Sequence, residues 1–266
     1  MISLSQLRQY KANGTKFSCL TCYDATFAHA MQTAHIDTIL IGDSLGMVIQ
    51  GQSSTVPVTV ADMAYHTRAV ARGNQHALIL ADLPFMSYAT IPDAIQSATT
   101  LMQAGAHVVK LEGGAWLAET VRVLAQGGIP SCVHLGLTPQ SVNVFGGYKV
   151  QGKTREAADR LLADCQAVVD AGAAILLLEC VPSQLAAEVQ ARFEVPVIGI
   201  GAGAACDGQV LVMHDMLGLH TGKPARFVRN FMQDATSITD AFAQFHQAVR
   251  EGSYPAPEHA FHIELN

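Results

Sequence analysis

The segment Val108–Gly114, with the sequence VVKLEGG, predicts both the fold and the site of this chain. It is an apolar run that ends in two glycines, as a central strand of a parallel sheet does, yet it contains a lysine and a glutamate. Because side chains alternate between the two faces of a strand, Lys110 and Glu112 point to the same side. Two ions on a buried face are costly unless they are paired or hydrated. The segment therefore predicts either a structural ion pair or a functional site at the carboxyl end of a strand.

Strand-like runs recur along the chain at residues 17–22, 38–41, 77–81, 106–111, 131–135, 173–178, 195–200 and 210–213. Helical patterns with one apolar face separate most of them, for example over 91–102 and 158–169. Such an alternation indicates a parallel sheet that is covered on its outside. Eight units favour an α/β fold of the closed (β/α)8 TIM-barrel type over an open sheet. The interval 201–209 is short for a parallel crossover, so either the seventh helix is vestigial or the eighth strand is misplaced.

The ends of the chain are expected to complete a single barrel domain over residues 1–266. Ser3 and Gln6 form a capping box that starts a helix within residues 1–14, which is placed to plug one end of the barrel. Residues 225–266 are expected to form C-terminal helices, over 227–231 and from Ile238 onward, followed by an irregular tail.

The composition limits the partners of the protein. A net charge of −6 gives no electrostatic reason to bind nucleic acid or a lipid surface. We expect a cytoplasmic protein with no membrane contact, since no signal peptide or membrane-length apolar run is present. A small molecule is the expected ligand. Cys19 and Cys22 have C-x-x-C spacing, but on a strand they face opposite sides and cannot bind one metal ion.

Polar residues stand at the ends of the apolar runs, where a (β/α)8 barrel has its active site. They are Tyr23 with Asp24, Asp43 with Ser44, Asp82, Lys110 with Glu112, His134 and Glu179. Any one of them could be a helix cap or a satisfied core group. Their convergence on one mouth, with a lysine and a histidine among them, favours a functional site.

The types of these residues suggest the chemistry. Asp43, Asp82 and Glu112 form an all-oxygen set of the kind that binds Mg²⁺, whereas the histidines do not cluster as a zinc site requires. Glu179 lies within the apolar run LLLECV, and apolar neighbours suit a carboxyl group to act as a general base. The alternative for Glu179 is a buried acid that a backbone amide satisfies.

Three motifs have less specific meanings. Gly42–Leu45 spells the GDSL block of a family of serine esterases, but no downstream D-x-x-H completes it. Residues 199–204, GIGAGA, fit a relaxed dinucleotide fingerprint without its acidic partner, so we expect close backbone packing or loop freedom instead. Residues 145–152 form a glycine-rich loop that is suited to act as a lid.

Blocks of sequence from about residue 3 to the Tyr254-Pro255 region together resemble the ketopantoate hydroxymethyltransferases. They are IGDSLGM (41–47), ADLPF (81–85), VKLEGG (109–114), HLGLTPQ (134–140), LECVP (178–182) and IGIGAG (198–203). The chain departs from the common residues at Cys19, Cys22 and 204–206, none of which is a proposed catalytic position.

The resemblance implies a barrel of the phosphoenolpyruvate/pyruvate type, assembled as a homodecamer. It implies transfer of a hydroxymethyl group from 5,10-methylenetetrahydrofolate to 3-methyl-2-oxobutanoate, forming 2-dehydropantoate for pantothenate synthesis through a Mg²⁺-stabilised enolate. The folate would lie across the mouth under the 145–152 loop.

The resemblance also implies a role for each site residue. Asp43 and Asp82 would bind Mg²⁺, with Glu112 in the metal shell through water. Lys110 and Ser44 would contact the substrate oxygens, and Glu179 would remove the proton from C3. His134 is expected to position the substrate or the one-carbon unit. The alternatives are a Mg²⁺-dependent C–C lyase or phosphonomutase on another 2-oxo acid, a serine esterase, and a non-enzymatic barrel.

Overall fold

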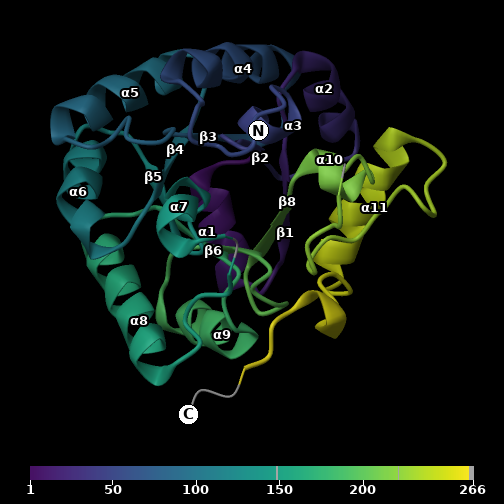
Figure 1. Cartoon of the computed structure of the whole chain (residues 1–266). Coiled ribbons are helices and arrows are strands. Elements are labelled where there is room, and N and C mark those ends of the chain that lie inside the picture. The colour runs from purple at the N-terminus through teal and green to yellow at the C-terminus, as the bar shows by residue number, and fades with distance from the viewer. Residues whose placement is uncertain (148, 221, 264–266) are drawn as a thin grey trace.

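Eight parallel strands close into a barrel in the computed structural model, which describes residues 1–147, 149–220 and 222–263 (Figure 1). Each strand pairs with the next one along the chain, and the eighth pairs with the first. The strands are β1 (Phe17–Thr21), β2 (Thr38–Ile41), β3 (Leu78–Asp82), β4 (Val108–Glu112), β5 (Ser131–Gly136), β6 (Ile175–Glu179), β7 (Val197–Ile200) and β8 (Gly208–Leu211). The predicted (β/α)8 barrel is therefore confirmed.

Helices cover the barrel, most of them in a ring around it and the first and seventh across its two ends (Figure 1). They are α1 (Leu4–Ala12), α2 (Ala25–Thr33), α3 (Leu45–Val48), α4 (Val60–Gly73), α5 (Ile91–Gln103), α6 (Ala118–Gln126), α7 (Val142–Phe145), α8 (Arg155–Asp170), α9 (Ser183–Arg192), α10 (Met213–Met216) and α11 (Ile238–Arg250), with 3₁₀ turns η1 (Ala115–Leu117), η2 (Pro139–Ser141) and η3 (Pro257–His259). Thr59 and Thr90 start two of the helices as N-caps, since each side chain accepts a backbone hydrogen bond three residues on. None of the helices within the described residues is long and apolar enough to cross a membrane.

Alternate residues of each strand pack into two separate apolar regions. In β4, Val108 packs with apolar residues of the other strands inside the barrel, whereas Val109 and Leu111 pack with residues of the surrounding helices. Lys110 and Glu112 are in phase with Val108, so both point into the barrel. Their common direction, predicted from the sequence, is confirmed by a distance of 3.5 Å between Lys110 Nζ and Glu112 Oε1.

The two cysteines of the C-x-x-C spacing follow the same alternation. Cys19 lies in the interior region and Cys22 in the outer region, and both are buried free thiols. The predicted opposite orientation of the two side chains is confirmed, since one packs inside the barrel and the other outside it.

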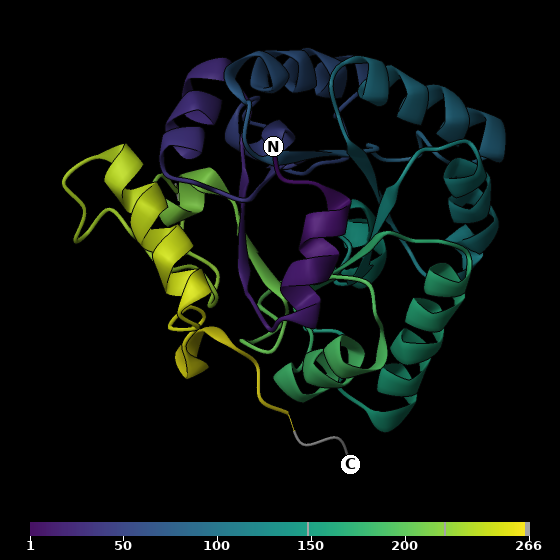
Figure 2. The same ribbon diagram turned by 180° about the vertical axis from the view of Figure 1, so that it is seen from behind.

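Helix α1 crosses the amino-terminal end of the barrel (Figure 2). Its Leu7 and the preceding Ile2 belong to the interior apolar region. Lys11 also forms a partly buried ion pair of 2.9 Å with Asp207, directly before β8. The predicted N-terminal helix thus closes one end, and the functional side chains lie at the other.

The short interval before the eighth strand is explained by both of the alternatives considered above, a vestigial seventh helix and a misplaced strand, and the predicted bounds of that strand need correction. Residues 201–207 form a loop without a helix, so the seventh helix is missing, and β8 begins at 208 instead of 210. Gly208 is the register partner of Phe17 in β1, and a side chain at residue 208 would collide with the ring of Phe17. The loop itself depends on glycine, since Gly201 and Gly203 adopt left-handed backbone angles with φ of 61° and 85°. Close packing is also present, because a Cβ on Gly199 would lie 2.7 Å from Cys206 Sγ.

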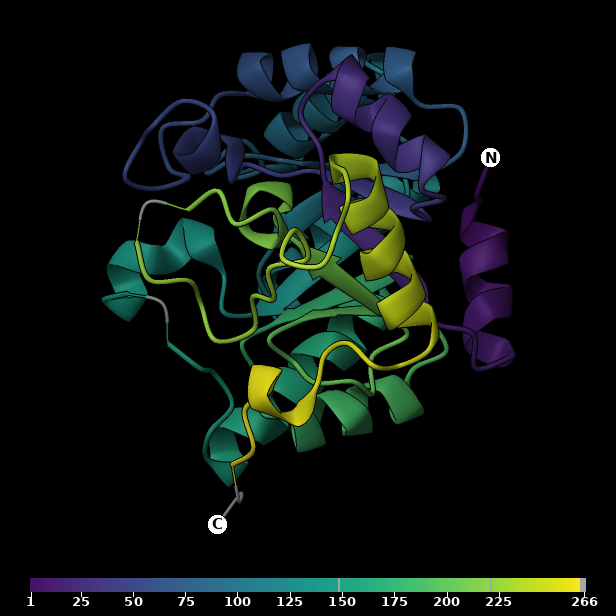
Figure 3. The same cartoon turned by 90° about the vertical axis from the view of Figure 1, so that its right-hand side faces the viewer.

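The predicted helix over residues 227–231 is wrong. The segment between α10 and α11 has no helix among its described residues and runs along the mouth of the barrel (Figure 3). Its apolar side chains are held by tertiary contacts: Phe231 is buried, and the hydroxyl of Tyr254 donates to the carbonyl of Phe227 at 2.6 Å. Helix α11 is present as predicted and packs on α2 and β1. Tyr148 of the predicted lid and residues 264–266 of the predicted tail lie outside the described residues.

Candidate active site

A cavity of about 560 Å³ opens at the carboxyl ends of the strands. Its lining includes all of the residues predicted for the site, namely Asp43, Ser44, Asp82, Lys110, Glu112, His134 and Glu179. Asp24 does not line it, because its carboxylate caps α2 by accepting a hydrogen bond from Phe27 N at 2.9 Å. The structure therefore brings together the predicted set and assigns Asp24 to helix capping.

The strand register explains why these side chains meet. Asp82 at the end of β3 is the register partner of Lys110 in β4, and Glu112 is the partner of His134 in β5. Register partners on neighbouring parallel strands point to the same side of the sheet. As a result, Lys110 Nζ lies 2.5 Å from Asp82 Oδ1, and His134 Nδ1 lies 3.3 Å from Glu112 Oε1.

Lys110 is the buried cation of the carboxylate cluster formed by Asp43, Asp82 and Glu112. All four side chains are almost fully buried, with Lys110 only 3% exposed. Burial alone would lower the pKa of Lys110, but the three surrounding carboxylates outweigh burial and raise it well above its usual value. Lys110 is therefore a permanent positive charge at the floor of the cavity.

The carboxylates divide into two kinds according to their partners. Burial, with repulsion from Asp82 and Glu112, raises the pKa of Asp43 well above its usual range. Burial also raises the pKa of Asp82, although Lys110 opposes the shift. For Glu112 burial acts in the same direction, but Lys110, His134 and a hydrogen bond from the backbone N–H of Gln140 outweigh it and lower the pKa. Burial and mutual repulsion thus favour the protonated forms of Asp43 and Asp82, and a cation bound between them would favour their ionised forms.

His134 lies between two carboxylates. Its Nδ1 faces Glu112, and its Nε2 lies 3.3 Å from Oε2 of Glu179. Burial and Lys110 would lower the pKa of His134, but the two glutamates outweigh them and raise it to about 9. The imidazolium form is therefore favoured near neutral pH, and it links the buried cluster to Glu179, whose side chain is 14% exposed to the cavity.

Gln140 is a site residue to which sequence reasoning gave no role. It lies in η2, the 3₁₀ turn that follows β5, and β5 is the strand that contains His134. Its Nε2 donates to Asp43 Oδ2 at 2.9 Å, and its backbone N–H donates to Glu112 Oε2 at 2.9 Å. The side-chain oxygen accepts a hydrogen bond of 2.6 Å from Tyr88. Gln140 therefore fixes two of the carboxylates, and its position in the block HLGLTPQ was the available signal.

Ser44 directly precedes the short helix α3 at the mouth. Its Oγ lies 2.9 Å from the hydroxyl of Tyr23, and Tyr23 is fully covered by its neighbours. A Cβ on Gly42 would lie 2.6 Å from Ser44 Oγ, so glycine is required for the hydroxyl to fold back over the chain. Within the described residues the hydroxyl has tyrosine as its partner and no histidine, so the geometry provides no base for a serine nucleophile.

The residues at the floor fit a hard divalent cation. Among the described residues no group of three or more His, Cys, Asp and Glu side chains is arranged to hold a metal ion. Mg²⁺, however, is usually bound through one or two carboxylates and keeps several waters. Asp43 and Asp82 provide such a pair, and Lys110 does not balance the charge of the three carboxylates around it. In the part of the chain that the structure describes, the carboxylate of Glu112 has three protein partners (Lys110, His134 and the backbone N–H of Gln140), whereas that of Asp82 has two (Lys110 and the backbone N–H of Asp43), so a water-mediated place fits Glu112.

Solved structures of other proteins share this architecture. A phosphoenolpyruvate phosphomutase from Streptomyces platensis subsp. rosaceus superposes with a TM-score of 0.62 at 14% identity, covering 81% of this chain and 83% of that one. A phosphonopyruvate hydrolase, solved in complex with oxalate and Mg²⁺, gives 0.60 at 12% identity, covering 80% and 81%. The fold is also similar to that of a 2,3-dimethylmalate lyase, a member of the PEP mutase/isocitrate lyase superfamily, with a TM-score of 0.56 at 17% identity, covering 79% of this chain and 81% of that one.

Sequence comparison identifies the family of the chain. The family model of ketopantoate hydroxymethyltransferase matches residues 1–257. An Acinetobacter baumannii (strain SDF) protein named 3-methyl-2-oxobutanoate hydroxymethyltransferase is 69% identical over 269 positions, covering 100% of both chains. A protein of the same name from Psychrobacter cryohalolentis is 63% identical over 265 positions, covering 98% of this chain and 100% of the relative. The chain belongs to the ketopantoate hydroxymethyltransferase family, and it is an enzyme that acts on small molecules.

Proposed function

We propose that this hydroxymethyltransferase uses 5,10-methylenetetrahydrofolate as donor and 3-methyl-2-oxobutanoate as acceptor, and forms 2-dehydropantoate for pantothenate synthesis. Family membership and the names of the 69% identical relatives support the acceptor. The observation that carries the chemistry is the buried group of Asp43, Asp82, Glu112 and Lys110, with Glu179 facing the same cavity. These groups suit removal of a proton from a carbon next to a ketone.

Glu179 is the proposed general base. It ends β6, lines the cavity and is the acid of the site that keeps partial contact with solvent. Its carboxylate removes the proton from C3 of the 2-oxo acid, and His134 holds the carboxylate in place from the buried side. Because the imidazolium contacts one oxygen of Glu179, the other oxygen is the one directed to the substrate.

Mg²⁺ is the proposed metal, bound by Asp43 and Asp82 with Glu112 in its shell through water. When bound, it supplies Lewis-acid polarisation of the keto group, which makes the neighbouring C–H acidic. The phosphonopyruvate hydrolase of the same fold was solved with Mg²⁺ and oxalate, a dicarboxylate with oxygens spaced as in a 2-oxo acid, and this supports the choice. Gln140 orients Asp43 for this role through its 2.9 Å hydrogen bond.

Lys110 and Ser44 are the proposed contacts of the substrate oxygens. The ammonium group of Lys110 offsets negative charge that develops on the keto oxygen as C3 loses its proton. The hydroxyl of Ser44, placed by Tyr23, donates to the carboxylate of the 2-oxo acid. Both groups are set by buried partners before the substrate arrives, so little reorganisation is needed.

The bond-forming step joins C3 to the one-carbon unit. The electron pair left on C3 forms the new C–C bond, and the bonds between the one-carbon unit and the donor nitrogens break. Water supplies the hydroxyl oxygen, because the donor holds its carbon between two nitrogens. The proton taken by Glu179 returns to the products, which are tetrahydrofolate and 2-dehydropantoate.

The assay that tests this function mixes the purified protein with both substrates, with Mg²⁺ or with EDTA, and measures 2-dehydropantoate by mass spectrometry. We expect product only when Mg²⁺ and both substrates are present. Cleavage of another 2-oxo acid, or rearrangement of phosphoenolpyruvate, without formation of 2-dehydropantoate would support the lyase or phosphonomutase alternative instead. The homodecamer, the cytoplasmic location and the lid over 145–152 remain predictions. Light scattering of the purified protein tests the homodecamer.

A further inference from the structure

A second part of the cavity lining has a different chemical character from the carboxylate cluster. We call it the basic-aromatic wall, and it consists of Lys223, Arg226, Phe227 and Phe261. Within the described part of the chain, neither Lys223 nor Arg226 forms an ion pair with a carboxylate. Lys223 and Arg226 are thus two cations of the cavity lining without an anionic partner in residues 1–147, 149–220 and 222–263, and the proposed proton removal does not use them.

The basic-aromatic wall lies across the mouth from the carboxylate cluster. Three of its residues belong to the segment that follows β8 and α10, whereas Lys110 and Glu112 belong to β4. In the closed barrel β4 and β8 are four strands apart in both directions. A ligand that contacts both parts must therefore extend across the opening, or two ligands must lie side by side in it.

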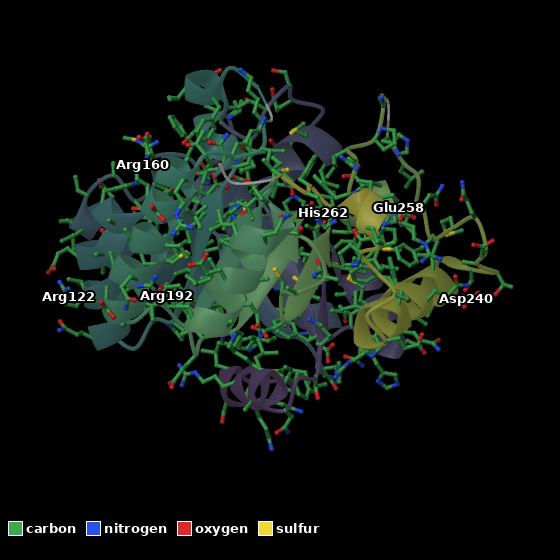
Figure 4. All side chains as sticks on the ribbon, turned by 90° about the horizontal axis from the view of Figure 1, so that it is seen from below. Arg122, Arg160, Arg192, Asp240, Glu258 and His262 are labelled. Carbon is green, nitrogen blue, oxygen red and sulfur yellow. The ribbon has the colours of Figure 1, made fainter. Side chains whose placement is uncertain are left out.

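The C-terminal segment holds the wall in position. The hydroxyl of Tyr254 donates to Phe227 O at 2.6 Å, and Arg226 Nε donates to Glu258 O at 2.8 Å. The guanidinium carbon of Arg226 also lies 5.5 Å from the centre of the Phe261 ring. Figure 4 shows Glu258 and His262 on this segment, in the half of the molecule away from α1. Because the backbone contact uses only Nε, the terminal nitrogens of Arg226 remain available to a ligand.

The ring of Phe227 also packs on the loop between β7 and β8. A Cβ on Gly201 would lie 2.7 Å from Phe227 Cδ1, so the ring packs directly on the β7–β8 loop. This loop, residues 201–207, stands in the place of the seventh helix. The wall is therefore a supported aromatic surface with a guanidinium group held beside it.

These features define the ligand that the wall would bind. Aromatic rings stack on ring systems, and Arg pairs with carboxylates through two parallel hydrogen bonds. A small 2-oxo acid does not fill a cavity of about 560 Å³, a size that suits a ligand of drug-like dimensions. We propose that the basic-aromatic wall binds the one-carbon donor, with the aromatic parts of the folate against Phe227 and Phe261 and the glutamate carboxylates on Arg226 and Lys223. This proposal rests on the proposed function of the same site.

The test compares Arg226→Gln and the double variant Lys223→Ala/Arg226→Gln with the wild type. For each protein, steady-state kinetics give the KM for the folate donor and the KM for the 2-oxo acid, and calorimetry gives the Kd for tetrahydrofolate. We expect the donor KM and the tetrahydrofolate Kd to rise about tenfold or more, the scale of a lost charged hydrogen bond, with the 2-oxo acid KM within about twofold. Arg122→Gln is the matched control, because Arg122 is an exposed residue on α6 that does not line the cavity (Figure 4).

A truncated donor, 5,10-methylenetetrahydropteroate, identifies the part of the folate involved. It lacks the glutamate, so the wild type should bind it more weakly and Arg226→Gln should cause no further loss. A defect of the same size with both donors would overturn the assignment of Arg226 to the glutamate tail. Unchanged donor KM and tetrahydrofolate Kd in the double variant, or a rise in the 2-oxo acid KM alone, would overturn the whole proposal.

Exchange of the C3 proton with D₂O separates this proposal from the proposed function. It requires the 2-oxo acid and Mg²⁺ but no donor, so it reports on the carboxylate cluster alone. If the wild type exchanges the C3 proton but the variants do not change donor binding, the assignment of the donor to the basic-aromatic wall is wrong and the proposed proton removal still stands. Absence of both exchange and product in the wild type means that the proposed function itself is wrong.

Discussion

The ammonium group of Lys110 lies 2.5 Å from Oδ1 of Asp82, and the two residues are register partners on adjacent strands. The pair is buried at the carboxyl end of the barrel, together with Asp43 and Glu112. A barrel that only needed a stable interior would have apolar side chains in this layer, since replacing buried ion pairs by apolar residues often stabilises a protein. The arrangement is therefore best explained by the chemistry of the site.

Replacement of Lys110 tests the charge balance of this cluster. Lys110→Met leaves three buried carboxylates without their cation, and we expect the free energy of unfolding to fall by about 3–5 kcal/mol in the absence of metal. Urea denaturation in EDTA measures it. The control is Lys153→Met, an exposed lysine, which should change stability by no more than about 0.5 kcal/mol. A loss of less than about 1 kcal/mol for Lys110→Met would mean that the cluster does not depend on this charge.

Gln140 is expected to be a positioning residue for Asp43. Gln140→Leu removes the 2.9 Å hydrogen bond to Asp43 Oδ2, and it leaves the hydroxyl of Tyr88 with only the longer contact of 3.2 Å to the carbonyl of Glu112. A hydrogen bond to a charged group contributes about 1.5–3 kcal/mol, so kcat/KM should fall about 10- to 100-fold. Steady-state kinetics at increasing Mg²⁺ should show partial recovery, which a purely structural defect would not give. Gln166→Leu, on the exposed face of α8, is the control and should behave as the wild type.

Ser44 distinguishes substrate binding from nucleophilic catalysis. With Ser44→Ala we expect the KM for the 2-oxo acid to rise about tenfold and kcat to change little, because the hydroxyl contacts the substrate carboxylate in ground state and transition state alike. Initial rates at varied 2-oxo acid give both constants. Tyr23→Phe should produce a smaller effect in the same direction, since it removes only the partner of the hydroxyl. Loss of all turnover in Ser44→Ala would contradict the binding role.

Acid sensitivity is expected from the other end of the barrel. Burial, helped by Arg250, lowers the pKa of His246, although Asp37 opposes the shift. The folded state then favours neutral His246, so its contribution to stability is present above pH 6.5 and is lost as the pH falls through the lowered value.

The measurement for His246 is the free energy of unfolding at several pH values between about 7.5 and about 5. Stability of the wild type should fall over this range, and His246→Gln should show a smaller fall. His29→Gln, at an exposed position of α2, serves as the control and should keep the wild-type slope. An unchanged slope in His246→Gln would show that another group causes the acid sensitivity.

The inward side chains of the barrel could be predicted from the sequence because they obey a local rule. In β4 the alternation of Val108, Val109, Lys110, Leu111 and Glu112 fixes the direction of each side chain, whichever neighbours the strand has. The positions of Asp82 and Glu179 as last residues of apolar runs follow in the same way.

Other parts of the structure depend on tertiary contacts and could not be predicted. Gln140 lies in a 3₁₀ turn with no strand phase, so its hydrogen bonds to Asp43 and Glu112 exist only once the strands that carry them have assembled. Phe227 and Phe231 have the spacing of residues on one face of a helix. The segment is irregular, however, because Phe227 is held by its contacts with Gly201 and Tyr254. The start of β8 depends on its pairing with β1, where Gly208 is the register partner of Phe17 and leaves room for its ring.

Exchange of the C3 proton of 3-methyl-2-oxobutanoate with D₂O, followed by NMR in the wild type and in Glu179→Gln, tests the central claim most directly. With Mg²⁺ and no donor, the wild type should exchange this proton. Exchange in the variant should be slower by about 10²-fold or more, the usual effect of removing a general base. Calorimetry should show that the variant still binds Mg²⁺ and the 2-oxo acid. Exchange at the wild-type rate in Glu179→Gln would show that another group takes the proton.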